Sequence, residues 1–252
     1  MVYDLKSRNV LVTGGSRGLG ALTVERFAKE GCNIVVNYVS ATSAAEALVA
    51  NITNTYGVKS VAIQADVGIE ADCRRLVQES ISALGGLDII ISNAGWTKLG
   101  GFGDLNSLSS DDWDKCWNIN VKASLFLMQA ALPTFNVNPE GGVFLITSSC
   151  AASNPAGSSM AYSVSKAAGL HLMKCLAATQ GPKVRVDAIQ PGLLLTEWGA
   201  KFGEEKIREA IEKAGLKKLA SLEDCAEAFV YLAKADTVTG AAVRIDGGQF
   251  QH

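Results

Sequence analysis

Short apolar runs alternate with amphipathic stretches along the whole chain, and this alternation restricts the fold more than any other feature. Each run is continuously apolar, which is typical of strands that are covered on both faces. Helical stretches separate the runs, and parallel neighbours need such crossovers, so the pattern indicates βαβ units. We therefore predict an α/β fold with one doubly wound parallel sheet and helices on both faces. Its seven strands would contain residues 10–12, 34–36, 61–63, 89–91, 143–146, 184–186 and 242–245.

Composition excludes several classes of protein. The 252 residues are 48% hydrophobic and 19% charged, and neither a repeat nor a linker divides them, so we predict a single domain over residues 1–252. The 23 basic and 25 acidic residues leave a net charge of −2, which argues against nucleic-acid binding. No apolar run approaches the roughly 18 residues of a membrane span, and no secretory signal is visible. We therefore expect a soluble, cytoplasmic protein without nucleic-acid or membrane partners.

The cysteines and histidines do not form the patterns of a metal site. The six cysteines are tens of residues apart and contain no CxxC pair, so we expect reduced, mostly buried thiols. The chain has only two histidines, His171 and His252. A zinc site or a His-based catalytic triad would depend almost entirely on His171, so we predict neither.

A glycine-rich turn directly follows the first predicted strand, with the sequence Thr13-Gly14-Gly15-Ser16-Arg17-Gly18-Leu19-Gly20. Glycines allow a tight turn and a close approach of a pyrophosphate, and the next helix presents free N–H groups to its charge. The spacing GxxxGxG is neither the GxGxxG dinucleotide motif nor the GxxxxGK[ST] phosphate loop. A dinucleotide site is favoured, and a ligand-free turn or a methyltransferase-like nucleotide site is the alternative.

The end of the second strand bears on which dinucleotide fits, because an acidic side chain there holds the adenosine ribose of NAD. Residues 37–40 read Asn-Tyr-Val-Ser and contain no carboxylate. Arg17 lies inside the glycine-rich turn, and its guanidinium matches the geometry of a 2′-phosphate. The alternative for Arg17 is a solvated loop charge. Together these features favour NADP(H) over NAD(H).

Tyr162 and Lys166 are four residues apart on a predicted helix and therefore share one face. An ammonium about 4 Å from a phenolate stabilises it by a few kcal/mol, which lowers the phenol pKa toward the range useful for acid–base catalysis. Such pairs also arise by chance on helices. Ser149 strengthens the catalytic interpretation, because it follows the fifth strand at the sheet edge where ligands bind.

Taken in order, these motifs resemble the short-chain dehydrogenase/reductase family from Asn9 to about Gly248. The matching motifs are the TGxxxGxG turn, Asn93-Ala94-Gly95, Ser149 with Tyr162-x-x-x-Lys166, Pro191-Gly192-x-x-x-Thr196 and Asp246-Gly247-Gly248. The resemblance implies a Rossmann-like sheet of about seven strands in the order 3-2-1-4-5-6-7. It also implies a homodimer or homotetramer.

The resemblance assigns a role to each catalytic candidate. It implies that Tyr162 is the acid–base and that Ser149 orients and polarises the carbonyl group. It implies that Lys166 holds the nicotinamide ribose and lowers the Tyr162 pKa. Asn120 matches the fourth catalytic residue of the family, which supports a water in the proton relay, and Asn118 is the alternative for that role.

The resemblance also implies the cofactor contacts. Asp66 and Val67 should meet the adenine, Asn93 should lie near the adenosine, and Leu194 and Thr196 should meet the nicotinamide carboxamide. The full predicted set is Gly14, Ser16, Arg17, Gly18, Leu19, Gly20, Asn37, Tyr38, Asp66, Val67, Asn93, Ala94, Gly95, Tyr162, Lys166, Pro191, Gly192, Leu194 and Thr196.

Three further features concern the substrate side and the sheet. Residues 197–218 correspond to the mobile flap over the substrate in the family. Trp96 and Trp198 follow cofactor motifs, so they either shape an apolar substrate pocket or simply pack in the protein. Asp187 stands where the family often has asparagine, and we expect this departure to alter only a local contact.

These observations lead to one expected function. The chain should be an NADPH-dependent oxidoreductase that reduces a ketone or aldehyde to an alcohol, or runs the reverse reaction, with Tyr162 as the acid–base. One alternative is a non-redox enzyme on the same scaffold, such as an epimerase, a dehydratase or a cyclase. The other alternative is a cofactor-sensing binding protein, although such a protein has no need of Ser149, Tyr162 and Lys166 together.

Overall fold

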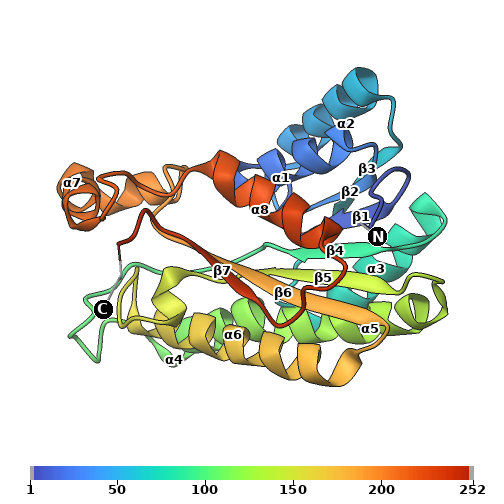
Figure 1. Cartoon of the computed structure of the whole chain (residues 1–252). Helices are drawn as coiled ribbons and strands as arrows, with labels where there is room; N and C mark the ends of the chain where they lie inside the picture. Colours follow the sequence, from blue (N-terminus) through green and yellow to red (C-terminus); the bar gives the residue numbers. More distant parts are fainter. Residues whose placement is uncertain (1–2, 250–252) are drawn as a thin grey trace.

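The computed structural model describes residues 3–249, and in this part of the chain seven parallel strands form one sheet in the order β3-β2-β1-β4-β5-β6-β7 (Figure 1). The predicted fold class and strand order are thereby confirmed, and each predicted apolar run lies within a strand. The strands are β1 (Asn9–Val12), β2 (Asn33–Tyr38), β3 (Ser60–Gln64), β4 (Ile89–Ser92), β5 (Gly142–Thr147), β6 (Val184–Pro191) and β7 (Ala242–Ile245).

Helices connect the strands and cover both faces of the sheet (Figure 1). One layer consists of α1 (Gly18–Lys29), α2 (Thr42–Tyr56) and α8 (Leu222–Lys234). The other consists of α3 (Glu70–Leu84), α5 (Ala123–Val137) and α6 (Met160–Gln180). The remaining elements are α4 (Ser110–Trp117), the π-helical turn η1 (Asn118–Lys122), the 3₁₀ turns η2 (Cys150–Ala152) and η3 (Gly199–Phe202), and α7 (Glu204–Lys213).

Successive residues of each strand enter opposite cores. Val10 and Val12 of β1 pack with α1, α2 and α8, whereas Leu11 between them packs with α3, α5 and α6. All three side chains are fully buried, and each such burial contributes about 1.5–3 kcal/mol. Since both faces of the sheet are buried, its strands are continuously apolar.

The strand order reverses between β1 and β4, and this reversal positions the site. After β1 the chain builds β2 and β3 on one side, and it then returns to place β4 on the other side of β1. The connections leave the carboxyl ends of these two strands in opposite directions, so a crevice opens between them. The loops that carry the glycine-rich turn and Asn93 flank this crevice. Among the helices of the described chain, none has the length and apolarity to cross a membrane.

Asp187 and five of the six cysteines are buried in the protein. Asp187 of β6 is fully buried, and its Oδ1 accepts a hydrogen bond from the Ala241 backbone N–H at 2.9 Å, so its contact is the local one that we expected. Burial raises the pKa of this carboxyl group. All six cysteines are free thiols, with Cys175 exposed and the others buried. His252 lies outside the described residues.

Candidate active site

The glycine-rich turn after β1 is fixed against the loop after β4. Thr13 Oγ1 accepts hydrogen bonds from the backbone N–H groups of Asn93 at 2.9 Å and Ala94 at 3.0 Å. The Asn93 Nδ2 donates to the Thr13 carbonyl oxygen at 3.0 Å. A Cβ at position 20 would collide with the Gly14 carbonyl oxygen and would lie 2.7 Å from Asn93 Nδ2. Gly20 therefore lets the backbone fold this tightly, while Gly14 has a φ of +59°, which favours glycine.

The start of α1 has the features of a phosphate-binding site. Arg17 is the N-cap residue, its side chain makes no capping bond, and the first turn carries no acidic residue. The N–H groups at the helix start are therefore not bonded by a capping side chain. The Arg17 guanidinium is exposed and pairs with Glu197 at 3.2 Å, so the predicted phosphate ligand contacts the start of the flap.

Asn37 braces the turn from the β2 side. Its side chain is buried, its Oδ1 accepts from the Gly14 backbone N–H at 3.2 Å, and its Nδ2 donates to the Ala65 carbonyl oxygen at 3.0 Å. The neighbouring Tyr38 side chain is also buried, whereas Val39 is half exposed. The structure thus directs the Asn37 side chain into the protein, and no carboxylate lies at the end of β2.

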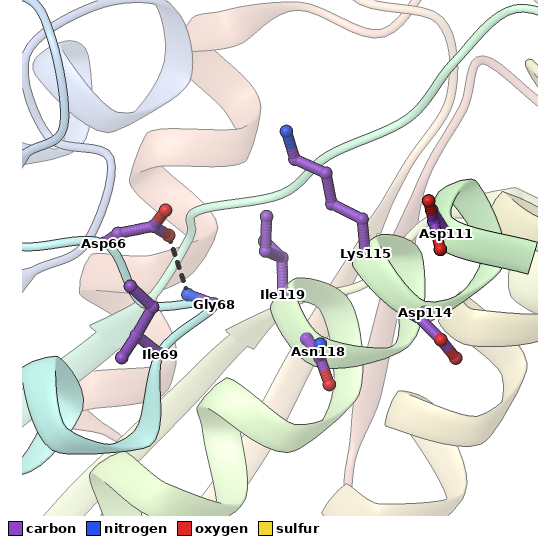
Figure 2. A pocket seen from close by; sticks show the side chains of 8 residues that line it. All are labelled: Asp66, Gly68, Ile69, Asp111, Asp114, Lys115, Asn118 and Ile119. Carbon is purple, nitrogen blue, oxygen red and sulfur yellow. Dashed lines mark hydrogen bonds between the residues drawn. The ribbon is translucent and has the colours of Figure 1, made fainter.

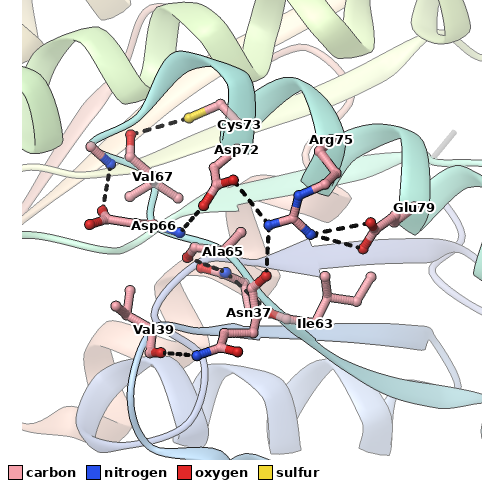
Figure 3. A network of polar contacts seen from close by, with 12 residues as sticks. Asn37, Val39, Ile63, Ala65, Asp66, Val67, Asp72, Cys73, Arg75 and Glu79 are labelled. Carbon is pink, nitrogen blue, oxygen red and sulfur yellow. Dashed lines mark hydrogen bonds and ion pairs between the residues drawn. The ribbon is translucent and has the colours of Figure 1, made fainter.

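A polar network holds the loop after β3 in place (Figure 3). The Asp72 carboxylate accepts from the Asp66 backbone N–H at 2.8 Å, and Arg75 bonds both Asp72 and the Gln64 carbonyl oxygen. The backbone bond to Asp66 and the Arg75 guanidinium lower the pKa of Asp72. This network fixes Asp66, while Val67 beside it is buried.

Asp66 borders a pocket of about 230 Å³ between the loop after β3 and α4 (Figure 2). Asn118 lines the same pocket. Its Oδ1 accepts a hydrogen bond from Lys122 at 2.9 Å. The structure therefore separates the two asparagines that the sequence offers for one role.

Asn120 belongs to the π-helical turn η1 and lies at the centre of the site. Its Oδ1 accepts from the Trp96 backbone N–H at 2.9 Å, and its Nδ2 donates to the Trp96 carbonyl oxygen and to Ser165 Oγ, each at 2.9 Å. A Cβ at Gly95 would lie 3.5 Å from both Asn120 Oδ1 and Lys166 Nζ. Of the two asparagines, Asn120 is thus the one near Lys166. Single-turn π-helices are frequent at functional sites.

The first turn of α6 places the tyrosine. The Ser159 hydroxyl caps the helix by accepting from the Tyr162 backbone N–H at 3.3 Å. The Tyr162 ring meets the Trp198 ring edge-on, with centroids 5.9 Å apart. Ser149 is buried at the start of η2, and its hydroxyl hydrogen-bonds with the Tyr162 phenol. Three separate segments therefore meet at the phenol.

Burial controls the charges of Tyr162 and Lys166. It raises the pKa of Tyr162 above its ordinary value of 10.0, and the Ser149 hydroxyl opposes this shift. Burial also lowers the pKa of Lys166 to about 8. The Lys166 Nζ donates to the Thr147 carbonyl oxygen at 2.7 Å and lies 5.6 Å from the Tyr162 ring centroid. The expectation that Lys166 acidifies Tyr162 is not met here, because the ammonium bonds a carbonyl oxygen while desolvation dominates at the phenol.

The segment after β6 packs against both β7 and the glycine-rich turn. The Gly192 backbone N–H donates to the Ile245 carbonyl oxygen at 2.8 Å. A Cβ at Gly18 would lie 3.3 Å from Thr196 Cγ2, so Thr196 packs against the glycine-rich turn. Because β4 and β6 are parallel strands of one sheet, Pro191, Leu194 and the other predicted cofactor residues after β6 lie at the same edge of the sheet as Gly95.

Two positioning residues were not singled out from the sequence. Thr13 was quoted only as part of its motif, yet its hydroxyl joins the loops after β1 and β4. Gln190 is buried in β6, and its Nε2 donates to the Ser149 carbonyl oxygen at 3.3 Å and to Ser153 Oγ at 2.9 Å. A polar residue inside an apolar strand was the available signal for Gln190.

Comparisons with known proteins agree over nearly the full chain. A family model described as "Enoyl-(Acyl carrier protein) reductase" matches residues 14–249. Glucose 1-dehydrogenase 2 of Bacillus subtilis is 32% identical, over 98% of this chain and 96% of its own. A 3-oxoacyl-(acyl-carrier-protein) reductase of Staphylococcus epidermidis is 30% identical, over 97% of this chain and 99% of its own.

Solved structures give the same result. A short chain dehydrogenase from Burkholderia cenocepacia in complex with NADP is 31% identical, covers 98% of this chain and 99% of its own, and has a TM-score of 0.89. A 7α-hydroxysteroid dehydrogenase complexed with NADH and 7-oxo glycochenodeoxycholic acid is 29% identical, covers 99% and 97%, and has a TM-score of 0.90. With its strand order, glycine-rich turn and full-length relatives, this chain belongs to the short-chain dehydrogenase/reductase family of oxidoreductases.

Proposed function

We propose that the protein reduces a small ketone or aldehyde with NADPH, or oxidises the corresponding alcohol with NADP⁺. The observation that carries the proposal is the convergence around Gly95. Asn120 Oδ1, Lys166 Nζ and Trp198 Cη2 lie 3.5, 3.5 and 3.7 Å from the place of a Cβ on this residue. Tyr162 joins them through its ring contact with Trp198. An acid–base group, a cation and an amide thus surround one small residue at the sheet edge.

The residues present fit a dinucleotide. Gly20 lets the glycine-rich turn pack closely against the start of α1, which offers N–H groups without a capping side chain. With the phosphates of a dinucleotide bound at this turn, its nicotinamide ring would supply or accept a hydride near Tyr162. Lys166 would hold the nicotinamide ribose, Thr196 and Leu194 would contact the carboxamide, and Asp66 with Val67 would contact the adenine.

In this mechanism the protein positions the carbonyl group and moves the proton. The raised pKa of Tyr162 keeps its phenol protonated at neutral pH, so the phenol starts as the proton donor that reduction requires. Ser149 donates a hydrogen bond to the substrate oxygen and stabilises the charge that develops there. Lys166 would return a proton to Tyr162 through a water, and Asn120 would help to hold that water. The Trp198 ring restricts the access of solvent to the phenol.

Replacing Tyr162 with phenylalanine tests the mechanism. Tyr162→Phe removes the proton donor while preserving the ring contact with Trp198, so kcat for ketone reduction should fall by about 10²–10⁴-fold. NADPH binding, measured by fluorescence titration, should change little. Activity equal to that of the native enzyme would refute the assignment of Tyr162.

The cofactor preference rests on Arg17 and on the lack of a carboxylate at the end of β2. Relatives bind either cofactor, since the structures above contain NADP in one case and NADH in the other. Arg17→Ala should raise the Kd of NADPH about tenfold and leave that of NADH nearly unchanged, because only NADPH carries the 2′-phosphate. Arg17→Lys, which keeps the charge, is the control. Equal effects on both cofactors would contradict the NADP assignment.

The two alternative functions are separated by one assay. NADPH absorbance is followed with a panel of ketones and aldehydes. Net oxidation supports the reductase, product without oxidation indicates an epimerase, dehydratase or cyclase, and binding without product indicates a sensor. The cytoplasmic location and the homodimer or homotetramer stay predictions.

A further inference from the structure

A second pocket, of about 360 Å³, opens beside the catalytic tyrosine. Three segments form it: the loop after β4, the loop after η2, and the flap from η3 to the start of α7. The Gly100 backbone N–H donates to the Ser158 carbonyl oxygen at 3.0 Å and ties the first two segments together. The lining consists of Leu99, Gly100, Gly101, Phe102, Gly157, Ser158, Lys201, Phe202 and Lys206.

Gly157 connects this pocket with the reaction centre. It lines the pocket, and a Cβ built on it would lie 3.3 Å from Tyr162 Cδ1. Gly157 thus packs against one edge of the Tyr162 ring and is the residue that links this ring with the pocket. A molecule with its carbonyl group at the phenol would have to pass Gly157 to enter the pocket.

The pocket combines an apolar wall with positive charge. Leu99, Phe102 and Phe202 supply the apolar surface. Lys201 and Lys206 are its charged lining residues, and no acidic side chain is among the described residues that line it. Within residues 3–249, neither of these ammonium groups forms an ion pair or a hydrogen bond. By contrast, Lys213 further along α7 pairs with Glu209 at 3.4 Å.

We propose that the substrate of this enzyme is an apolar carbonyl compound that bears an acidic group, with the anion bound between Lys201 and Lys206. The proposal rests on the proposed reductase function and specifies its substrate class. The carbonyl oxygen lies at Tyr162 and Ser149, the apolar body lies along Phe102 and Phe202, and the anion lies at the flap. A carboxylate and a phosphate share this chemistry, because an ammonium binds either as a point charge.

Binding of matched ligands tests the proposal directly. The probes are aryl methyl ketones that carry a carboxylate, or a phosphonate, on a para chain of zero to four methylenes, each compared with its neutral methyl ester. Isothermal titration calorimetry on the NADP⁺-saturated enzyme gives the ratio of ester Kd to acid Kd. We expect a ratio of about ten for the best chain length, which two partly solvated ion pairs supply, and a decrease toward one in 0.5 M salt.

Variants then locate the charge. K201Q/K206Q should lower the ratio of ester Kd to acid Kd to less than about two. The control K213Q changes a lysine on the same helix as Lys206 but outside the pocket, and it should keep the native ratio. K201E/K206E should favour an ammonium-bearing ketone over the acid. A native ratio of one, or a ratio that survives K201Q/K206Q in a folded protein, would overturn the proposal.

Turnover separates failure of this inference from failure of the reductase function. If the native enzyme oxidises NADPH with the neutral esters but shows no preference for the acids, the substrate class is wrong and the reductase function stands. If no ketone of either kind causes NADPH oxidation, the reductase function is wrong and the acid is not a substrate. The Kd values of the carboxylate and phosphonate probes show which of the two anions the lysines bind more tightly.

Discussion

The glycine-rich turn and the flap (residues 197–218) touch each other through Arg17 and Glu197, yet they are built in opposite ways. Buried side chains brace the turn, since Thr13 and Asn37 are at most 1% exposed and bond three neighbouring loops. The flap has almost no interior, because its buried residues are the small Gly199, Ala210 and Ala214 (Figure 1). This contrast teaches that the fold braces the region proposed to hold the cofactor and leaves the region proposed to meet the substrate with few internal contacts.

The flap contacts the rest of the protein through few bonds. The backbone N–H groups of Gly215 and Leu216 donate to the carbonyl oxygens of Gly248 at 3.2 Å and Gly247 at 2.9 Å. The Arg17–Glu197 pair ties its first residue to the glycine-rich turn. Segments with little buried apolar surface open at a low free-energy cost. We therefore expect the flap to open without disturbing the turn.

The largest expected effect on stability and cofactor affinity comes from adding one methyl group to the glycine-rich turn, compared with adding one to an open loop. Gly20→Ala places a Cβ against the Gly14 carbonyl oxygen and Asn93 Nδ2, so the turn must shift. We expect the free energy of unfolding to fall by about 1–3 kcal/mol, measured by denaturant titration. NADPH affinity should fall more than 100-fold, by about 3 kcal/mol or more, because the phosphate-binding backbone moves.

Gly103→Ala is the matched control. Gly103 lies in the loop after β4, and a Cβ there has no heavy atom within 4 Å. We expect its stability and its NADPH affinity to stay close to the native values. If Gly20→Ala behaved like Gly103→Ala, the turn would be less tightly constrained than its hydrogen bonds indicate.

The proposed catalytic pair, Tyr162 and Lys166, is buried like the turn, and a change of pH should affect it by an intermediate amount. Burial lowers the pKa of Lys166 to about 8, so its ammonium is lost as pH rises through this value. Burial raises the pKa of Tyr162, so the phenol keeps its proton over the same range. Reduction at saturating NADPH should therefore be steady below pH 8 and decline about tenfold per pH unit well above it.

The measurement is a plot of log(kcat/KM) against pH from 6 to 10 for a neutral ketone. A neutral probe keeps the ionisation of the substrate out of the profile. An activity that stayed constant to pH 10 would show that the proton on Lys166 is not needed.

The fold was predictable from the sequence, and several of the predicted site residues lie together in the folded chain. Continuous apolar runs such as 10–12 predicted strands buried on both faces, and the strand ends placed Ser149 near Tyr162. The sequence could not predict the charge state of the pair, because the Thr147 carbonyl oxygen that binds Lys166 and the burial of both groups arise only in the folded chain. The lysine pocket was missed for the same reason, since three loops distant in sequence form it.

The Arg17–Glu197 pair joins the two regions, and breaking it should have the smallest effect. Both side chains are more than half exposed, at 58% and 80%, so the pair contributes little to stability, and Glu197→Gln should shift Tm by less than about 2 °C. The substitution releases Arg17 from a competing carboxylate. The Kd of NADPH should therefore fall about two- to fivefold, while that of NADH stays unchanged. Glu205→Gln, an exposed change on α7, is the control. An equal gain for both cofactors would mean that Glu197 restrains the whole flap rather than the phosphate ligand.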